Sequence, residues 1–181
     1  MPGLLDWFTL LTGVMFVVLL ALHGASFLAM KTRGELQAKA EALAKPVTVV
    51  LVLLLVAVVM ALPSVQPAFG AHYAGAPIGY VWPLTAVVLL VVRYVSAGRQ
   101  RPFVGFVASS LLVASLLVAA AWGIFPNLLI ATTGQANSLT TLNAATDRTG
   151  LEAGLWWVPP GLLLVIFYQV YIHRLFAGPV R

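Results

Sequence analysis

The first long apolar stretch of the chain, residues 8–30, contains 23 residues and no charged side chain. A helix of that length extends about 34 Å, which is enough to cross a hydrocarbon core of about 30 Å. Only 8% of the 181 residues are charged and 61% are hydrophobic, whereas soluble domains carry about 25% charged residues. A chain this apolar must be solvated largely by lipid.

Four further apolar runs follow, so the predicted spans are residues 8–30, 47–62, 78–97, 103–124 and 155–176. We expect an all-α, polytopic bundle of five transmembrane helices that forms a single domain over residues 1–181. The second run is short, but residues 34–45 before it are rich in helix-forming side chains. Pro46 therefore lies either at a kink in one longer helix or in its first turn, and Pro63 is expected to end that helix.

The basic residues predict the orientation. Nine of the ten Lys and Arg residues fall in or beside the first connection, the third connection and the C-terminal tail, and Arg148 alone falls on the opposite side. The positive-inside rule then predicts an external N-terminus and a cytoplasmic C-terminus. Arg93 lies inside the third run and is expected to snorkel toward Arg99 and Arg101. We expect a multi-pass membrane protein.

The two connections predicted on the outer side differ in character. Residues 64–77 are rich in Pro, Gly and Ala and predict an irregular loop. Residues 126–154 form a longer and more polar outer loop with several leucines, and long loops without structure are uncommon unless they are functional or packed on something. This loop is therefore a candidate partner-docking segment, and its polar candidates are Asn127, Asn137, Ser138, Thr140 and Asn143.

Ionisable groups are scarce within the predicted spans. All five acidic residues lie outside or at the edge of the apolar runs, which disfavours ion-coupled transport. His23 is the only deeply placed candidate, and three roles are open to it: a haem ligand, a step in a proton path, or a neutral side chain bonded to Ser26, Ser109 or Ser115.

We assign no residue to catalysis, to cofactor binding or to metal binding. The chain has no cysteine, which excludes thiolate chemistry, and no glycine-rich phosphate loop. The net charge of +5 comes from residues that flank apolar runs, so it does not indicate a nucleic-acid partner.

Two stretches carry a family resemblance. One is LHGASFLAMKTRGEL at residues 22–36, and the other is FPN at 125–127 followed by NSLT at 137–140 and by Asn143 and Ala144. Both resemble subunit II of cytochrome bd-type quinol oxidases, and the order of the five predicted helices fits the second half of that subunit. The family's subunit is about twice as long, and its first four helices, with the acidic residues associated with proton entry, have no counterpart here.

The resemblance implies half of subunit II, split or truncated, in a complex that oxidises quinol and reduces O2 to water. The expected role is structural, with no cofactor in this chain and with b- and d-type haems in the partner, subunit I. Other expected partners are membrane lipid, quinone and, if it exists, a polypeptide that supplies the missing first half. The resemblance also implies a bacterial-type inner membrane. The alternatives are a small oligomeric transporter or channel, and an assembly factor for an oxidase.

Overall fold

The computed structural model describes residues 6–131, 134, 137–176 and 178. Within those residues, five helices are long and apolar enough to cross a membrane, which confirms the predicted all-α polytopic class. The chain divides into two compact units, with the boundary along the chain between Phe125 and Pro126, and each is described by itself. In chain order the elements are α1 (Trp7–Lys31), α2 (Glu35–Val65), α3 (Pro67–Gly75), the 3-10 helix η1 (Pro77–Tyr80), α4 (Val81–Gly98), α5 (Pro102–Ile124), β1 (Asn127–Leu129), β2 (Leu139–Thr140) and α6 (Arg148–Leu175).

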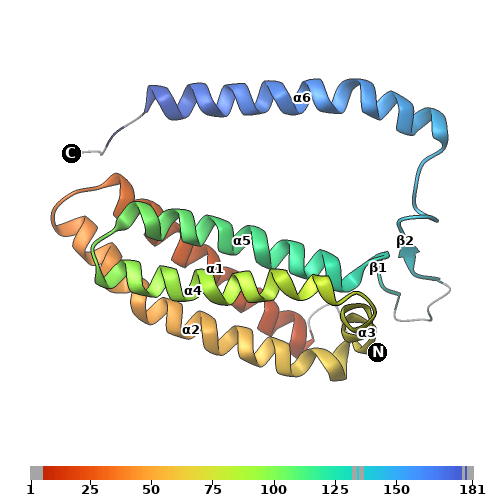
Figure 1. The fold of residues 1–181 in the computed structure, drawn as a ribbon, viewed down its shortest axis with the longest axis horizontal. Coiled ribbons are helices and arrows are strands. Elements are labelled where there is room, and N and C mark those ends of the chain that lie inside the picture. Colours follow the sequence, from red (N-terminus) through yellow and green to blue (C-terminus); the bar gives the residue numbers. More distant parts are fainter. Residues whose placement is uncertain (1–5, 132–133, 135–136, 177, 179–181) are drawn as a thin grey trace. The chain divides into compact units, whose positions relative to one another are not determined.

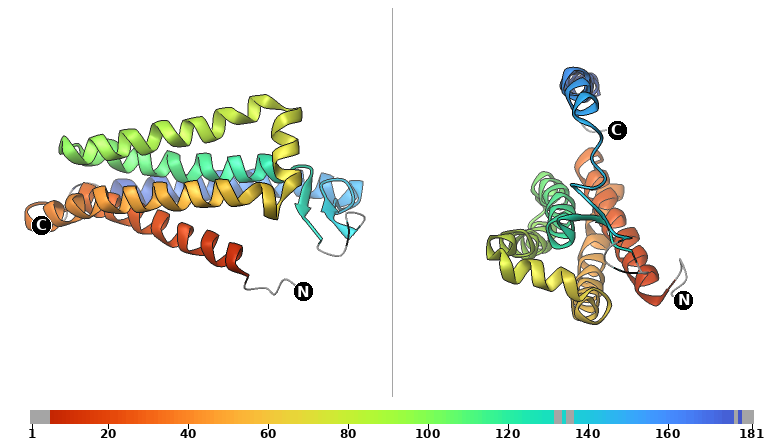
Figure 2. Two further views of the ribbon diagram at one scale, coloured as in Figure 1. Left: turned by 90° about the horizontal axis from the view of Figure 1, so that it is seen from below. Right: turned by 90° about the vertical axis from the view of Figure 1, so that its right-hand side faces the viewer.

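The first unit is an antiparallel four-helix bundle of α1, α2, α4 and α5 (Figure 1). Helix α1 packs against α2 and α5, and α4 packs against the same two helices, so the four form a ring around one core (Figure 2). The α1–α2 and α4–α5 connections lie at the same end of the bundle (Figure 1). We call this the basic end, because its connections and the adjoining turns carry Lys31, Arg33, Lys39, Lys45, Arg99 and Arg101.

The centre of the bundle holds a narrow apolar seam, while most large apolar side chains point outward. Leu19, Leu22, Leu51 and Leu112 are fully buried, but Val17 is 67% exposed. In a lipid solvent, helices gain little by hiding leucines from their surroundings, and small residues instead allow close approach. The buried positions accordingly include many small side chains: Ser26, Ala29, Ala40, Ala44, Gly105, Ala108 and Ser109.

Local chemistry fixes the ends of two helices. Asp6 caps α1 by accepting a hydrogen bond from the Thr9 amide at 2.7 Å, and this bond lowers the pKa of the Asp6 carboxyl. The α4–α5 turn places Gln100 at φ +51°, a left-handed conformation that usually favours glycine. The Arg101 amide then donates to the Ser96 carbonyl, which closes the turn.

Helix α2 is longer than the predicted span 47–62 because it continues through both of its prolines. Pro46 lies within one helix, which decides between the two roles left open for it. The expectation that Pro63 ends the helix is wrong, since α2 continues to Val65. The predicted spans 8–30 and 103–124 agree with α1 and α5 to within one residue at each end, and the span 78–97 falls on η1 and α4 together.

The connection at residues 64–77 is mostly helical, so its prediction as an irregular loop is wrong. Helix α3 begins at Pro67, a residue suited to the first turn of a helix, and it packs on α5. The Tyr73 hydroxyl donates to the Ala119 carbonyl at 2.7 Å, and burial raises the pKa of Tyr73. The Phe69 ring occupies the space that a side chain on Gly123 would need. Tertiary packing therefore stabilises this helix.

The second unit contains a short antiparallel hairpin of β1 and β2, followed by α6. Helix α6 begins at Arg148, whereas the predicted span begins at residue 155, so the connection is shorter than 126–154. The Asp147 carboxylate accepts from the Gly150 amide at 3.1 Å and caps the helix. Arg148 pairs with Glu152 at 2.7 Å, one turn further on. Both contacts favour the early start.

Candidate functional site

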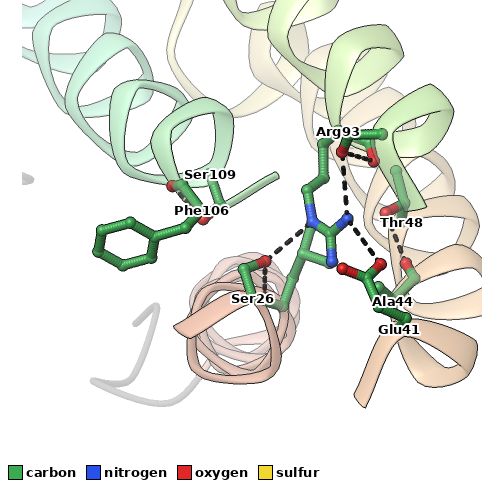
Figure 3. A network of polar contacts seen from close by, with 9 residues as sticks. Ser26, Glu41, Ala44, Thr48, Arg93, Phe106 and Ser109 are labelled. Carbon is green, nitrogen blue, oxygen red and sulfur yellow. Dashed lines mark hydrogen bonds and ion pairs between the residues drawn. The ribbon is translucent and has the colours of Figure 1, made fainter. Parts of the chain in front are cut away.

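A polar cluster lies inside the bundle near its basic end, and we call Ser26, Glu41, Arg93 and Ser96 the Arg93 cluster. The Arg93 side chain is fully buried. Its Nε donates to Ser26 Oγ at 2.8 Å, and its Nη1 donates to Ser96 Oγ at 3.4 Å. Nη1 also lies 3.8 Å from Glu41 Oε2 (Figure 3). One guanidinium thus contacts side chains of α1, α2 and α4.

The predicted snorkelling of Arg93 is wrong. A long basic side chain extends to the interface when no partner is closer, but here the carboxylate of α2 and the hydroxyl of α1 lie within reach. Helix α5 leaves the room that the guanidinium needs. A Cβ on Gly105 would lie 3.0 Å from both Arg93 Nη1 and Ser96 Oγ. The missing side chain of Gly105 therefore allows α5 to pack closely against Arg93 and Ser96.

Glu41 is the second charged group inside the bundle, with a side chain only 12% exposed. Among the described residues, neither of its carboxylate oxygens has a hydrogen-bond partner, and neither has Nη2 of Arg93. Burial inside the bundle therefore adds Glu41 to the candidate residues, although we singled out only His23 from the sequence. A signal for Glu41 exists in the sequence, because it continues the buried stripe of α2 at helical spacing: Ala44, Thr48, Leu51, Leu55 and Val58.

His23 is half-buried on α1, where it faces α5. Its Nδ1 lies 3.0 Å from Ser109 Oγ, and its ring stacks on Phe106 with 5.3 Å between ring centres. The Ser109 hydroxyl donates its single proton to the Phe106 carbonyl at 2.8 Å. The Ser109 hydroxyl has one proton for these two contacts, so His23 Nδ1 is the donor to Ser109 when that proton bonds the Phe106 carbonyl. Three serines were predicted as possible partners of His23. Of these, Ser26 instead accepts a hydrogen bond from Arg93, and Ser115 donates one to the Leu112 carbonyl.

No metal-ligating group is evident in the described residues, which contain no cluster of three or more His, Cys, Asp or Glu side chains. His72 contacts the rings of Trp122 and Phe125 at the opposite end of the bundle from Arg93. The Nδ1 of His173 contacts the backbone carbonyl of Gln169 on the same helix. A lone imidazole with a serine partner supplies at most one of the two axial ligands of a six-coordinate haem.

The polar residues predicted to form a docking loop bond mainly to one another. The Asn143 side chain accepts from the Thr140 amide at 2.6 Å and donates to the Ser138 carbonyl at 2.9 Å. Ser138 is buried and its Oγ accepts from the Ala131 amide at 3.1 Å. Asn127 pairs with Thr140 across the hairpin. The Asn137 amide donates a hydrogen bond to the Gly134 carbonyl. These residues give the loop its shape and leave Leu128, Leu129 and Leu142 exposed.

The basic end also carries a polar pocket of about 620 Å³ between the start of α2 and the α4–α5 turn. Its lining includes Arg33, Lys45, Gln37 and Gln100, together with Glu41. The Glu41 oxygens are buried beside Arg93, so Arg33 and Lys45 supply the charge that faces the pocket.

A helical bundle with apolar outer faces, an internal ion pair and a basic end defines a multi-pass integral membrane protein. The chain belongs to the family of cytochrome bd terminal oxidase subunit II, which it matches over residues 1–176. It is 25% identical to cytochrome bd-I ubiquinol oxidase subunit 2 of Escherichia coli strain K12, over 98% of this chain. The corresponding subunit of Escherichia coli O157:H7 gives the same identity and coverage. The chain spans about half, 54%, of the length of these relatives.

Proposed function

We propose that this chain works as half of subunit II in a cytochrome bd-type terminal oxidase, a complex that oxidises quinol and reduces O2 to water. The observation that carries the proposal is the family match, which extends over nearly the entire chain. The curated relatives are named as ubiquinol oxidase subunits. The chain covers 54% of their length, and the proposal assigns the remainder of the subunit to a further polypeptide segment.

The role that we propose for the chain is structural. Its bundle has a complete internal seam, and the Arg93 cluster links three of its helices. Membership of the subunit II family implies that another subunit carries the haems, and we place the b- and d-type haems on subunit I. The large apolar outer surface is then available for lipid, for quinone and for the haem-bearing partner.

We propose that the hairpin loop of the second unit docks on a partner subunit. The Asn143 side chain bonds to Thr140 and Ser138 within the loop, so this side chain is engaged there and is less available as a contact surface. The exposed leucines would provide that surface, and Leu142 is 87% exposed. Hydrogen bonds that restrain the described residues of this loop before docking reduce the entropy cost of binding.

Deletion of the gene tests the proposal. Membranes of the deletion strain are expected to lose quinol-driven oxygen consumption and the d-haem absorption band together, and the plasmid-borne chain should restore both. A deletion that leaves both signals unchanged would contradict the proposal. Loss of the signals that is restored by substoichiometric amounts of the chain would instead identify an assembly factor.

A further inference from the structure

A second depression at the basic end lies on the outer surface of the bundle, where α4 and α5 meet. It is a groove of about 240 Å³ whose lining includes Val91, Val92, Val95 and Val104, with Arg99 and Arg101 at one end. Its volume is below the roughly 300 Å³ at which small-molecule pockets begin. The groove is therefore suited to one segment of a hydrocarbon chain beside a charged group.

The valines and the arginines of the groove are expected to lie at different depths in the membrane. The valines belong to the spanning part of α4 and α5, whereas the two arginines flank the turn between these helices. Val91 precedes Arg99 by eight residues, or about 12 Å along the helix. The apolar strip therefore runs into the hydrocarbon region, and the arginines lie where the helices leave it.

The two guanidinium groups at the end of the groove are available to an external anion. Among the described residues, the ion pairs join Lys39 to Glu35, Arg93 to Glu41 and Arg148 to Glu152, so none involves Arg99 or Arg101. Both residues are exposed. Their spacing is fixed by the closed turn in which the Arg101 amide donates to the Ser96 carbonyl.

We propose that this groove binds one anionic phospholipid, with a phosphate on Arg99 and Arg101 and the upper part of an acyl chain along the valines. Basic pockets between spanning helices attract anionic headgroups, at about 1 kcal/mol for each Lys or Arg near the surface. The valine strip adds a requirement for an acyl chain, which a free phosphate or a polar peptide would not meet. This proposal does not depend on the oxidase assignment.

The test uses the full chain in the complex with which it purifies, washed free of native lipid in detergent. Native mass spectrometry with added dioleoyl phosphatidylglycerol, and separately with dioleoyl phosphatidylcholine, measures lipid retention. We expect selective retention of phosphatidylglycerol. The double variant Arg99→Gln/Arg101→Gln should weaken it about thirtyfold, which is the effect of removing two such charges. Inorganic phosphate at millimolar concentration should not displace the lipid.

Matched variants separate the groove from general attraction. Arg33→Gln/Lys39→Gln removes two charges from the same end of the bundle but outside the groove, and it should leave selective retention nearly unchanged. Val95→Trp should fill the groove and weaken retention, whereas Val88→Trp adds the same bulk to an exposed site on α4 outside it. Arg99→Lys/Arg101→Lys preserves the charge and should retain the lipid, which controls for folding of the turn.

Several results would overturn the proposal. Equal binding of both lipids, or equal loss in the two double-glutamine variants, would show only non-specific attraction to the basic end. Retention that survives Val95→Trp would show that no acyl chain lies in the groove. An intact complex that binds no phosphatidylglycerol would show that a protein surface covers the site.

Discussion

At the scale of single residues, the pairing of Arg93 with Glu41 is the most consequential contact in the bundle. Both charged side chains are removed from water, and the attraction between them offsets part of the desolvation cost of each. We expect Arg93→Ala to destabilise the protein by about 3–5 kcal/mol, because it leaves the Glu41 carboxylate buried and unpaired. Arg99→Ala, which removes an exposed charge only two turns away, is the control. Thermal unfolding in detergent, followed by circular dichroism, measures the difference.

The paired replacement Arg93→Met/Glu41→Leu shows whether Arg93→Ala loses stability because Glu41 is left unpaired or because packing is lost. Apolar residues of similar size often replace a buried ion pair without loss of stability. The double variant should therefore recover most of the stability lost in Arg93→Ala. If it unfolds as readily as the single variant, the ion pair is not the source of the loss.

His23 gives a second prediction at this scale. If subunit I supplies all the haem ligands, His23→Ala should leave the reduced-minus-oxidised spectrum of the complex unchanged. The variant should lose about 1 kcal/mol of stability with its hydrogen bond to Ser109. Ser109→Ala is the matched control, because it breaks the same bond without removing the imidazole. Disappearance of one haem band in His23→Ala alone would contradict the structural role.

The sequence indicates His23 more readily than the Arg93 cluster, for a physical reason. A lone polar side chain in the middle of an apolar run stands out, and it must find a partner on another helix. Glu41 lies in a stretch with Lys39 and Lys45, and a charged stretch of this kind predicts a solvent-exposed carboxylate. Its burial depends on α2 continuing through Pro46 and on the approach of α4, and neither is a local property of the sequence.

At the scale of elements, hydropathy locates the long helices but not the short one. The spans at 8–30, 78–97 and 103–124 are predicted closely because a long apolar run has few alternatives in lipid. Helix α3 lacks such a run and contains Gly70 and Gly75. Its helical form depends on two aromatic contacts with α5, made by Phe69 and Tyr73, and sequence periodicity does not report those contacts.

The anchoring of α3 is testable through Tyr73. Tyr73→Phe removes the hydroxyl that donates to Ala119 and should cost about 1 kcal/mol of stability. The effect should appear as faster amide hydrogen exchange in α3 than in α1. Tyr94→Phe provides the control, since Tyr94 lies half-exposed on α4. Unchanged exchange in α3 would show that the hydroxyl does not hold this helix.

At the scale of the whole molecule, the charge distribution predicts orientation in the membrane. The basic end should face the cytoplasm, so α3 should lie outside. The chain has no native cysteine, so Gln37→Cys and Gly70→Cys each introduce a single reporter. In right-side-out spheroplasts, a membrane-impermeant maleimide should label the Gly70→Cys protein at once and the Gln37→Cys protein only after permeabilisation. The reverse pattern would contradict the predicted orientation.

The measurement that tests the central claim most directly is recovery of the tagged chain from native membranes in mild detergent, followed by a reduced-minus-oxidised absorption spectrum. If the chain is a structural half of subunit II, b- and d-type haem bands should co-elute with it at stoichiometric yield. A colourless eluate that contains only oligomers of this chain would contradict the claim and favour an independent transporter or channel.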